Sequence, residues 1–295
     1  MEHTYDNSQL ATYQACPFSY YLQYIVCIKK NVYDDSNASM QFGSAAHSFW
    51  QEFYKPTGKK FSELIESYVE PEGMPQFSKQ ALEFFCKTYN DKYYEKDKQY
   101  NVKEVENVSK FNLGKYLFIV KKDGAIETQG NIYGLEHKTT KSLSYNYFEK
   151  YFLNSQISAQ CYDVIRKYGQ CSGILLNVGE IKMLKRKPSG EYDGFMQHPD
   201  GFITVKFNRD FINRTQDEIK DWEQNTVAWI EQIEENKQLG DWKKSCGSWG
   251  GMICSKCPYK ELCKTSVGMK LDESIMDVLY EKCNPFEYLE TEEGA

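Results

Sequence analysis

The chain has 295 residues, 41% of them hydrophobic and 26% charged, so it can bury a full core and does not have a disordered composition. Its formal charge of -6 excludes a strongly basic nucleic-acid-binding protein, and any nucleic acid would have to be bound by local patches. No apolar run is long enough to span a membrane, and the polar start MEHTYDNSQ lacks a signal-peptide layout, which predicts a cytoplasmic protein.

Ten cysteines in a chain with no export signal favour metal or cluster ligation over disulfides, because a reducing cytoplasm keeps thiols free. Histidine is scarce, and a site built mainly on imidazoles is therefore not expected. The four histidines are His3, His47, His137 and His198.

The first hundred residues are predicted to be mostly helical. Two short helical pieces are expected over residues 8–24, with Cys16 at their joint. A helix over residues 42–50 carries His47, which the local pattern alone assigns to the core rather than to a ligand set. Scaffold helices are predicted over residues 61–69 and 77–96.

From residue 101 the hydrophobic period changes to two, which predicts an antiparallel meander. The first strand contains Glu104 and Glu106. The second covers residues 115–120 and is expected to end in a turn at Lys122-Asp123-Gly124. The third covers residues 131–135 and leads into Glu136.

The third strand ends in Glu136-His137-Lys138 and opens into a polar segment that includes Lys141. Because residues i and i+2 project from one face of a strand, Glu136 and Lys138 are expected to point together and His137 away. The carboxylate can hold Mg²⁺ or Mn²⁺, and the ammonium can orient a metal-bound water, as phosphodiester cleavage requires. A surface ion pair is the alternative interpretation of E-x-K.

A helix is predicted over residues 154–168, with Gln156 in its first turn and Gly169 as its stop. Strands over residues 173–184 and 202–207 then flank a basic loop. This loop is expected either to contact DNA phosphates or to form a solvated hairpin tip. Its charged residues are Lys185, Arg186 and Lys187, and an amphipathic helix follows over residues 210–236.

The C-terminal part carries three thiols, Cys254, Cys257 and Cys263, at the spacing C-x2-C-x5-C. Three thiols leave a soft-metal centre one ligand short, whether it is a cubane iron-sulfur cluster or a tetrahedral zinc. The residues alone leave both Cys246 and Cys16 open as the fourth ligand.

The order of the motifs along the chain resembles that of the RecB/AddB-like exonucleases of the PD-(D/E)xK superfamily. The motifs are Cys16-Pro17, Gly43-x3-His47, Glu136-x-Lys138, Gln156 and the three C-terminal thiols. The likeness spans about residues 8–264 and is strongest to phage-encoded and CRISPR-adaptation members that carry an iron-sulfur cluster. The resemblance implies that His47 and Glu136 bind Mg²⁺ or Mn²⁺, that Lys138 is catalytic and that Gln156 supports the site. It also implies that Cys16 is the fourth ligand of a [4Fe-4S] cluster.

Two positions depart from the family pattern. The family places a metal-binding aspartate in a G-x-x-D sequence on the second strand, where this chain has Leu117. Asp123 is not expected to replace it, because six residues of extended strand span roughly 20 Å. Glu104 or Glu106 is the better-placed spare carboxylate, and the tyrosine expected four residues after Gln156 is Gln160.

The sequence thus predicts an α/β fold with a restriction-endonuclease-like core, that is, a mixed central sheet flanked by helices. A mostly helical part (residues 1–100), the nuclease core (101–209) and a long helix with the cluster segment (210–295) are expected to pack as a single unit.

The predicted function is a metal-dependent DNA nuclease acting on single strands or duplex ends in phage or bacterial recombination, repair or processing. A recombination or helicase protein is a possible partner, and a phage protein would act in the host cytoplasm. The lack of a long apolar run predicts no membrane association. One alternative is a DNA-binding pseudo-nuclease impaired by Leu117. The other is a zinc-ribbon interaction protein that uses Cys246.

Overall fold

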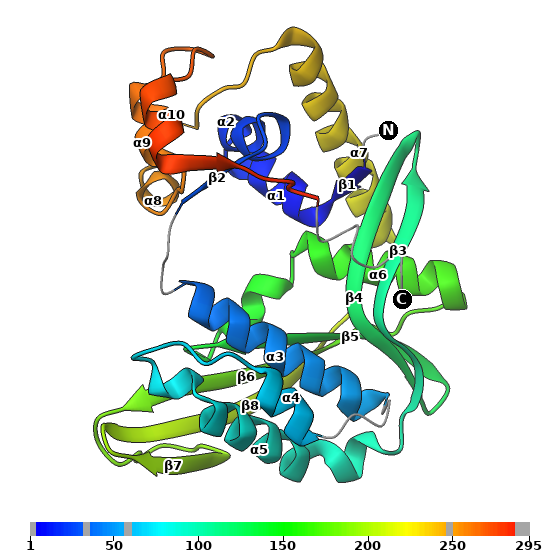
Figure 1. The fold of residues 1–295 in the computed structure, drawn as a ribbon. Helices are drawn as coiled ribbons and strands as arrows, with labels where there is room; N and C mark the ends of the chain where they lie inside the picture. Colours follow the sequence, from blue (N-terminus) through cyan, green and yellow to red (C-terminus); the bar gives the residue numbers. More distant parts are fainter. Residues whose placement is uncertain (1–3, 32–35, 56–60, 246–249, 287–295) are drawn as a thin grey trace. The chain divides into compact units, whose positions relative to one another are not determined.

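The computed structural model describes residues 4–31, 36–55, 61–245 and 250–286, which divide into two compact units (Figure 1). The first unit draws on Met1–Tyr33, Lys110–Ile119 and Lys220–Ala295, and the second on Asp34–Ser109 and Val120–Ile219. The division of the chain near residues 100 and 209 stays a prediction. Within the described residues, every helix is too short or too polar to cross a bilayer.

A mixed β-sheet forms the centre of the second unit. Its strands follow the order β4-β5-β6-β8-β7, with β3 beside β4. Strands β5 and β6 are parallel, whereas the pairs β4–β5, β6–β8 and β7–β8 are antiparallel. The strands are β3 (Asn101–Leu113), β4 (Tyr116–Thr128), β5 (Asn131–Thr140), β6 (Ile174–Leu184), β7 (Gly194–His198) and β8 (Gly201–Ile212).

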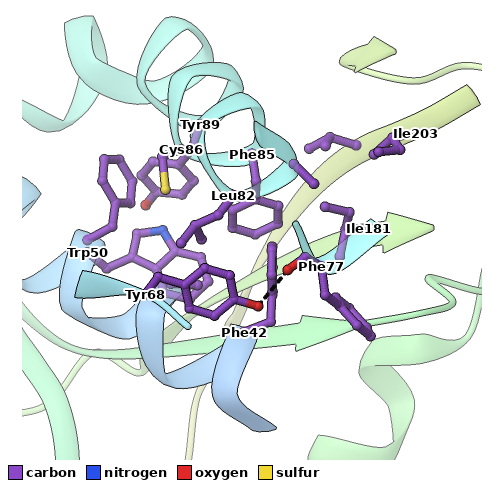
Figure 2. Close-up of a cluster of buried hydrophobic side chains, with 14 of the residues drawn as sticks. Phe42, Trp50, Tyr68, Phe77, Leu82, Phe85, Cys86, Tyr89, Ile181 and Ile203 are labelled. Carbon is purple, nitrogen blue, oxygen red and sulfur yellow. Dashed lines mark hydrogen bonds between the residues drawn. The ribbon is translucent and has the colours of Figure 1, made fainter. Parts of the chain in front are cut away.

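Helices cover both faces of this sheet, so the predicted α/β class is confirmed. One face carries α3 (Ser36–Tyr54), α4 (Phe61–Ser67), a 3-10 turn (Pro75–Phe77) and α5 (Lys79–Asp97). Figure 2 shows their aromatic core, in which the Tyr68 hydroxyl donates a hydrogen bond to the Phe77 carbonyl at 2.6 Å. A Cβ at Gly179 on β6 would collide with the Phe85 ring, so glycine lets α5 approach the sheet.

The other face of the sheet is covered by α6 (Ser155–Tyr168), which follows a 3-10 turn over Tyr147–Tyr151. The Asn154 side chain caps its first turn. Gly169 ends the helix, as predicted, in the left-handed conformation at φ +79°. Ile157 and Cys161 pack against alternate residues of β6, namely Ile174, Leu176 and Val178.

The first unit is built mainly from the two ends of the chain. Strand β1 pairs in parallel with the early part of β4, where Thr4 lies opposite Leu117, and β2 pairs antiparallel with β9. Cys16 lies at the joint of α1 and α2, as predicted. The elements are β1 (Thr4–Asp6), α1 (Asn7–Ala15), α2 (Pro17–Tyr20), a π-helical turn (Tyr21–Ile25), β2 (Ile28–Lys30), α7 (Gln216–Leu239), α8 (Gly250–Ser255), α9 (Lys260–Thr265), α10 (Glu273–Leu279) and β9 (Tyr280–Lys282).

Strand β4 differs from the expectation in a way that matters for the site. It runs unbroken through Lys122-Asp123-Gly124, so the turn predicted there is wrong. The hairpin turn lies instead at Gln129-Gly130, where φ is +51° and +76°, and Thr128 pairs with Asn131 across it. Two positive φ angles are typical of the tight turn that joins antiparallel strands.

Candidate functional site

Three side chains from three elements of the second unit converge in a group suited to a divalent cation. They are His47 on α3, Glu106 on β3 and Asp123 on β4, and one donor atom of each lies within 4.8 Å of the others. His47 Nδ1 is 3.1 Å from Asp123 Oδ1 and 3.9 Å from a carboxylate oxygen of Glu106. Imidazole nitrogen with carboxylate oxygens is a donor set that fits Mn²⁺ and Mg²⁺.

Backbone geometry separates the two glutamates of β3. Glu106 has φ +46°, a left-handed conformation that side chains other than glycine seldom adopt. In a regular strand Glu104 and Glu106 would share a face. Here Glu106 lies beside His47, whereas Glu104 pairs with Lys122 and Lys167. Of the two spare carboxylates expected from the sequence, the structure therefore brings Glu106 into the group and turns Glu104 away.

Glu136 and Lys138 of β5 point together, as predicted, and form an ion pair. Two amides of α6 hold the same carboxylate: Gln156 Nε2 donates to Glu136 Oε1 at 2.9 Å, and Gln160 Nε2 donates to Oε2 at 2.6 Å. From the sequence, Gln160 stands out only as a departure from the family pattern. Its spacing of one helical turn from Gln156 was the available signal, because residues i and i+4 share a helix face.

The surroundings shift the pKa values of these carboxylates in opposite directions. Burial, and then the charge of Asp123, raise the pKa of Glu136, although Lys138 and Gln160 oppose that shift. The Glu106 pKa is raised by burial and by the same Asp123 charge. Burial also favours the neutral form of Asp123, but the hydrogen bond and charge of His47 outweigh it and lower the Asp123 pKa. The group therefore holds more negative charge than its own cations balance, and a bound divalent cation would relieve that repulsion.

The two cationic partners respond to these carboxylates. Burial disfavours the charged form of His47, but the hydrogen bond to Asp123 and the nearby carboxylates raise its pKa overall. Burial likewise opposes charge on Lys138, and the charge of Glu136 raises the Lys138 pKa overall. Lys138 thus stays an ammonium, while a metal ion must displace a proton from His47 to bind it.

His137 faces α3, away from the Glu136 side chain, as predicted. Its ring stacks on Trp50 with centroids 4.5 Å apart, and its Nδ1 lies 3.2 Å from the Asn177 amide. Burial lowers the His137 pKa to about 3, so the ring is neutral. The backbone N–H of His137 donates to Asp123 Oδ2 at 2.5 Å, which ties β4 to β5 at the site.

The structure places a carboxylate of β4 in this group at a position that the sequence analysis did not favour. Leu117, the residue matched to the family aspartate, lies on β4 opposite Thr4 of the first unit. Asp123 is the β4 residue that meets His47 and Glu106. The strand does not end near Leu117 but continues to Thr128, so Asp123 lies within β4, six residues beyond Leu117, and does not have to reach back to that position.

The predicted DNA contacts lie elsewhere in the second unit. Lys185, Arg186 and Lys187 are exposed on the turn that follows β6, next to Lys182, which pairs with Glu180 at 2.7 Å. Lys141 directly follows β5 and holds its ammonium 5.3 Å above the Phe77 ring. These contacts do not test whether the four residues bind DNA, so that role stays a prediction.

The four predicted cluster thiols all belong to the first unit. Cys16 Sγ accepts a hydrogen bond from the Ser245 backbone N–H at 3.5 Å, and Cys254 Sγ donates to the carbonyl of that residue at 3.9 Å. Burial raises the pKa of Cys263, and the charges of Cys16, Cys257 and Cys254 add to that rise. Cys16 and Cys254, from opposite ends of the chain, thus both contact the backbone of Ser245. Cys246, the alternative ligand, lies outside the described residues.

Comparison with known proteins gave one family match. The model of the PD-(D/E)XK nuclease superfamily matches residues 7–264. No curated protein matched the chain. Among solved structures, the crystal structure of a protein designated SSO0001 aligns with 90% of this chain and 88% of its own at 13% identity and a TM-score of 0.38. A likeness this loose carries no argument about function.

Proposed function

Because the chain belongs to the PD-(D/E)XK nuclease superfamily, we propose that it is a metal-dependent deoxyribonuclease that hydrolyses phosphodiester bonds. The observation that carries the proposal is the convergence of His47, Glu106 and Asp123 beside the Glu136-Lys138 pair. A bound Mg²⁺ or Mn²⁺ would supply a nucleophilic water and neutralise charge on the phosphate. Mere retention of a fold would not require three buried or half-buried carboxylates to share one site.

The residues of the chain have separate tasks in this proposal. His47, Glu106 and Asp123 hold the cation, and Glu136 joins them through the carboxylate that Gln156 and Gln160 aim. Lys138 keeps its proton, because the charge of Glu136 raises its pKa, and its ammonium would orient the attacking water and balance charge on the phosphate.

We further propose action at DNA ends or on single strands, that is, an exonuclease of the RecB/AddB-like kind in phage or bacterial DNA recombination or repair. Lys141 and the turn over residues 185–187 would bind the phosphate backbone. The order of the motifs supports this finer proposal, because Gly43-x3-His47, Glu136-x-Lys138 and Gln156 follow one another as they do in that subfamily, although Leu117 and Gln160 depart from its pattern.

Cys16, Cys254, Cys257 and Cys263 are proposed to hold a [4Fe-4S] cluster. The support is that Cys16 and Cys254, from opposite ends of the chain, both hydrogen-bond to the Ser245 backbone, and that their charges add to the raised pKa values of Cys257 and Cys263. Four thiolates are the usual ligands of such a cluster. It would link α1 and α2 to the C-terminal segment and serve stability rather than cleavage.

The proposed function is tested by incubating end-labelled single-stranded, linear duplex and covalently closed circular DNA with Mg²⁺, Mn²⁺ or EDTA. We expect metal-dependent degradation of the two substrates with ends and no loss of the closed circle. Lys138→Ala should be inactive, whereas Lys182→Ala, which breaks an ion pair with Glu180 within β6, should keep activity. Equal activity in EDTA, or in Lys138→Ala, would refute the proposed chemistry.

A further inference from the structure

A second charged cluster lies on the other side of β3 and β4 from the proposed metal ligands. The Lys122 side chain is fully buried and contacts Glu104 on β3 and Asp163 on α6, whose own side chain is also fully buried. Lys167, one turn further along α6, lies 2.9 Å from Glu104, and the Ser109 hydroxyl donates to Asp163 at 2.8 Å. None of these groups has a role in the proposed chemistry.

Burying ions in this way is poor design for stability alone. Two charges lose their hydration when they are buried, and their mutual attraction offsets that loss only when the geometry is good. Apolar residues of similar size often stabilise a protein equally well. A buried lysine between two carboxylates is therefore better explained by the structural elements that it holds in place. The cluster joins three elements, β3, β4 and α6, and each of them also contributes to the proposed active site.

The cluster residues are immediate neighbours of the site residues. Lys122 directly precedes Asp123, and Lys122 contacts α6 while Asp123 contacts α3. Glu104 lies two residues before Glu106, whose left-handed backbone turns it to the opposite side. The contact between Glu104 and Lys122 therefore fixes the stretch of β3 from which Glu106 directs its carboxylate toward the metal site.

The backbones of β3 and β4 also pack closely beside this cluster. A Cβ at Gly124 would lie 2.6 Å from the Glu104 carbonyl oxygen, so β3 and β4 approach closely beside Asp123 only because residue 124 is glycine. On α6, Asp163 follows Gln156 and Gln160 at helical spacing, and all three side chains contact charged residues of the sheet. The helix is thus fastened at Lys122 one turn from where it holds Glu136.

We propose that the buried cluster of Glu104, Lys122 and Asp163 positions the metal-binding carboxylates, acting as a rigid support rather than as part of the reacting group. The inference rests on the proposed function, since it concerns the geometry of that same site. Partners that orient metal ligands typically change metal affinity by roughly ten- to a hundredfold when they are removed.

The test uses the triple variant Glu104→Gln, Lys122→Met, Asp163→Asn in the full-length protein. It removes all three charges but keeps acceptors for Lys167 and Ser109, so that no buried charge is left unpaired. The matched control is Lys92→Met with Asp193→Asn, which removes a half-buried ion pair between α5 and the segment before β7. Mn²⁺ affinity is measured by electron paramagnetic resonance without DNA, and thermal unfolding is measured in EDTA.

We expect the triple variant to bind Mn²⁺ at least tenfold more weakly than the wild type while it remains folded, with kcat for DNA reduced and KM little changed. The control should keep the wild-type Mn²⁺ affinity. A merely structural cluster would lower the melting temperature and leave the affinity of the folded protein unchanged, and that result would overturn the inference.

If the triple variant does not fold, Lys167→Met provides the second test, because that lysine is partly exposed and contacts Glu104 from the rim of the cluster. It should weaken Mn²⁺ binding in the same direction, and unchanged affinity would overturn the inference. Failure of the wild type itself to bind Mn²⁺ would instead refute the proposed function. The two failures are distinguishable because the wild type is measured first.

Discussion

Replacing Asp123 by asparagine tests the corrected register of β4. The side chain keeps its shape and one carbonyl oxygen, so it can still accept the hydrogen bond from the His137 backbone N–H. What it loses is the negative charge closest to His47, 3.1 Å away. A divalent cation and a carboxylate oxygen about 2.1 Å apart attract each other by about 4 kcal/mol even at the dielectric constant of water.

This energy corresponds to a roughly thousandfold weaker metal affinity, since each 1.4 kcal/mol is about tenfold. The metal-free protein should change little in stability. Loss of the His47 interaction is opposed by relief of the repulsion through which Asp123 raises the pKa values of Glu106 and Glu136. Asp123→Asn should therefore separate metal binding from folding.

The assay is Mn²⁺ titration by calorimetry, paired with thermal unfolding in EDTA. Leu117→Ala is the matched control, because Leu117 is the residue that the alternative register would place at the metal. The reasoning is refuted if Asp123→Asn keeps wild-type Mn²⁺ affinity, or if Leu117→Ala weakens binding by a similar factor.

Further consequences can be checked separately. Gln160→Leu should reduce kcat by roughly tenfold, because it removes one of the two amides that aim Glu136. Because the pKa of His47 is raised in the folded protein, its protonated form contributes stability that is complete below pH 6.5 and is lost as the pH rises through the raised value. The melting temperature of the metal-free wild type should therefore fall across this pH range, and that of His47→Gln should fall less. Charge reversal over residues 185–187 should weaken DNA binding and flatten its salt dependence by about one unit of slope per lost phosphate contact, whereas an unchanged salt slope would make them a solvated turn. Anaerobically purified protein should be brown, with absorption near roughly 400 nm that Cys16→Ala abolishes, whereas one zinc per colourless chain would contradict the cluster.

Much of the fold could be predicted because local signals agreed with the tertiary structure. Asn154 and Gly169 mark the ends of α6, and the pairing of Glu136 with Lys138 follows from the strand period. The joint at Cys16 was likewise visible, because proline at the first helical position starts a new helix.

The failure at Asp123-Gly124 has a specific physical cause. This dipeptide is among the strongest local signals for a hairpin turn. Here the glycine serves another purpose, since a side chain at that position would strike the Glu104 carbonyl. Close approach between neighbouring strands is a tertiary property that a local pattern does not contain. The true turn, Gln129-Gly130, carries a weaker signal.

The left-handed backbone of Glu106 was equally invisible in the sequence. Alternation along β3 places Glu104 and Glu106 on one face and makes them equivalent as spare ligands. Only the contacts with Lys122 on one side and His47 on the other distinguish them. The buried charges of Lys122 and Asp163 were missed for the same reason, because a charged residue in a strand is usually read as solvent-exposed.

The most direct test of this account is a crystal of the full-length protein soaked in Mn²⁺ and measured at the manganese absorption edge. The account predicts one strong anomalous peak within about 2.2 Å of donor atoms from His47, Glu106 or Asp123, with Glu136 in reach of the same ion. Bound manganese whose peak lies away from Asp123 would contradict the assignment of this group as the metal centre of the nuclease.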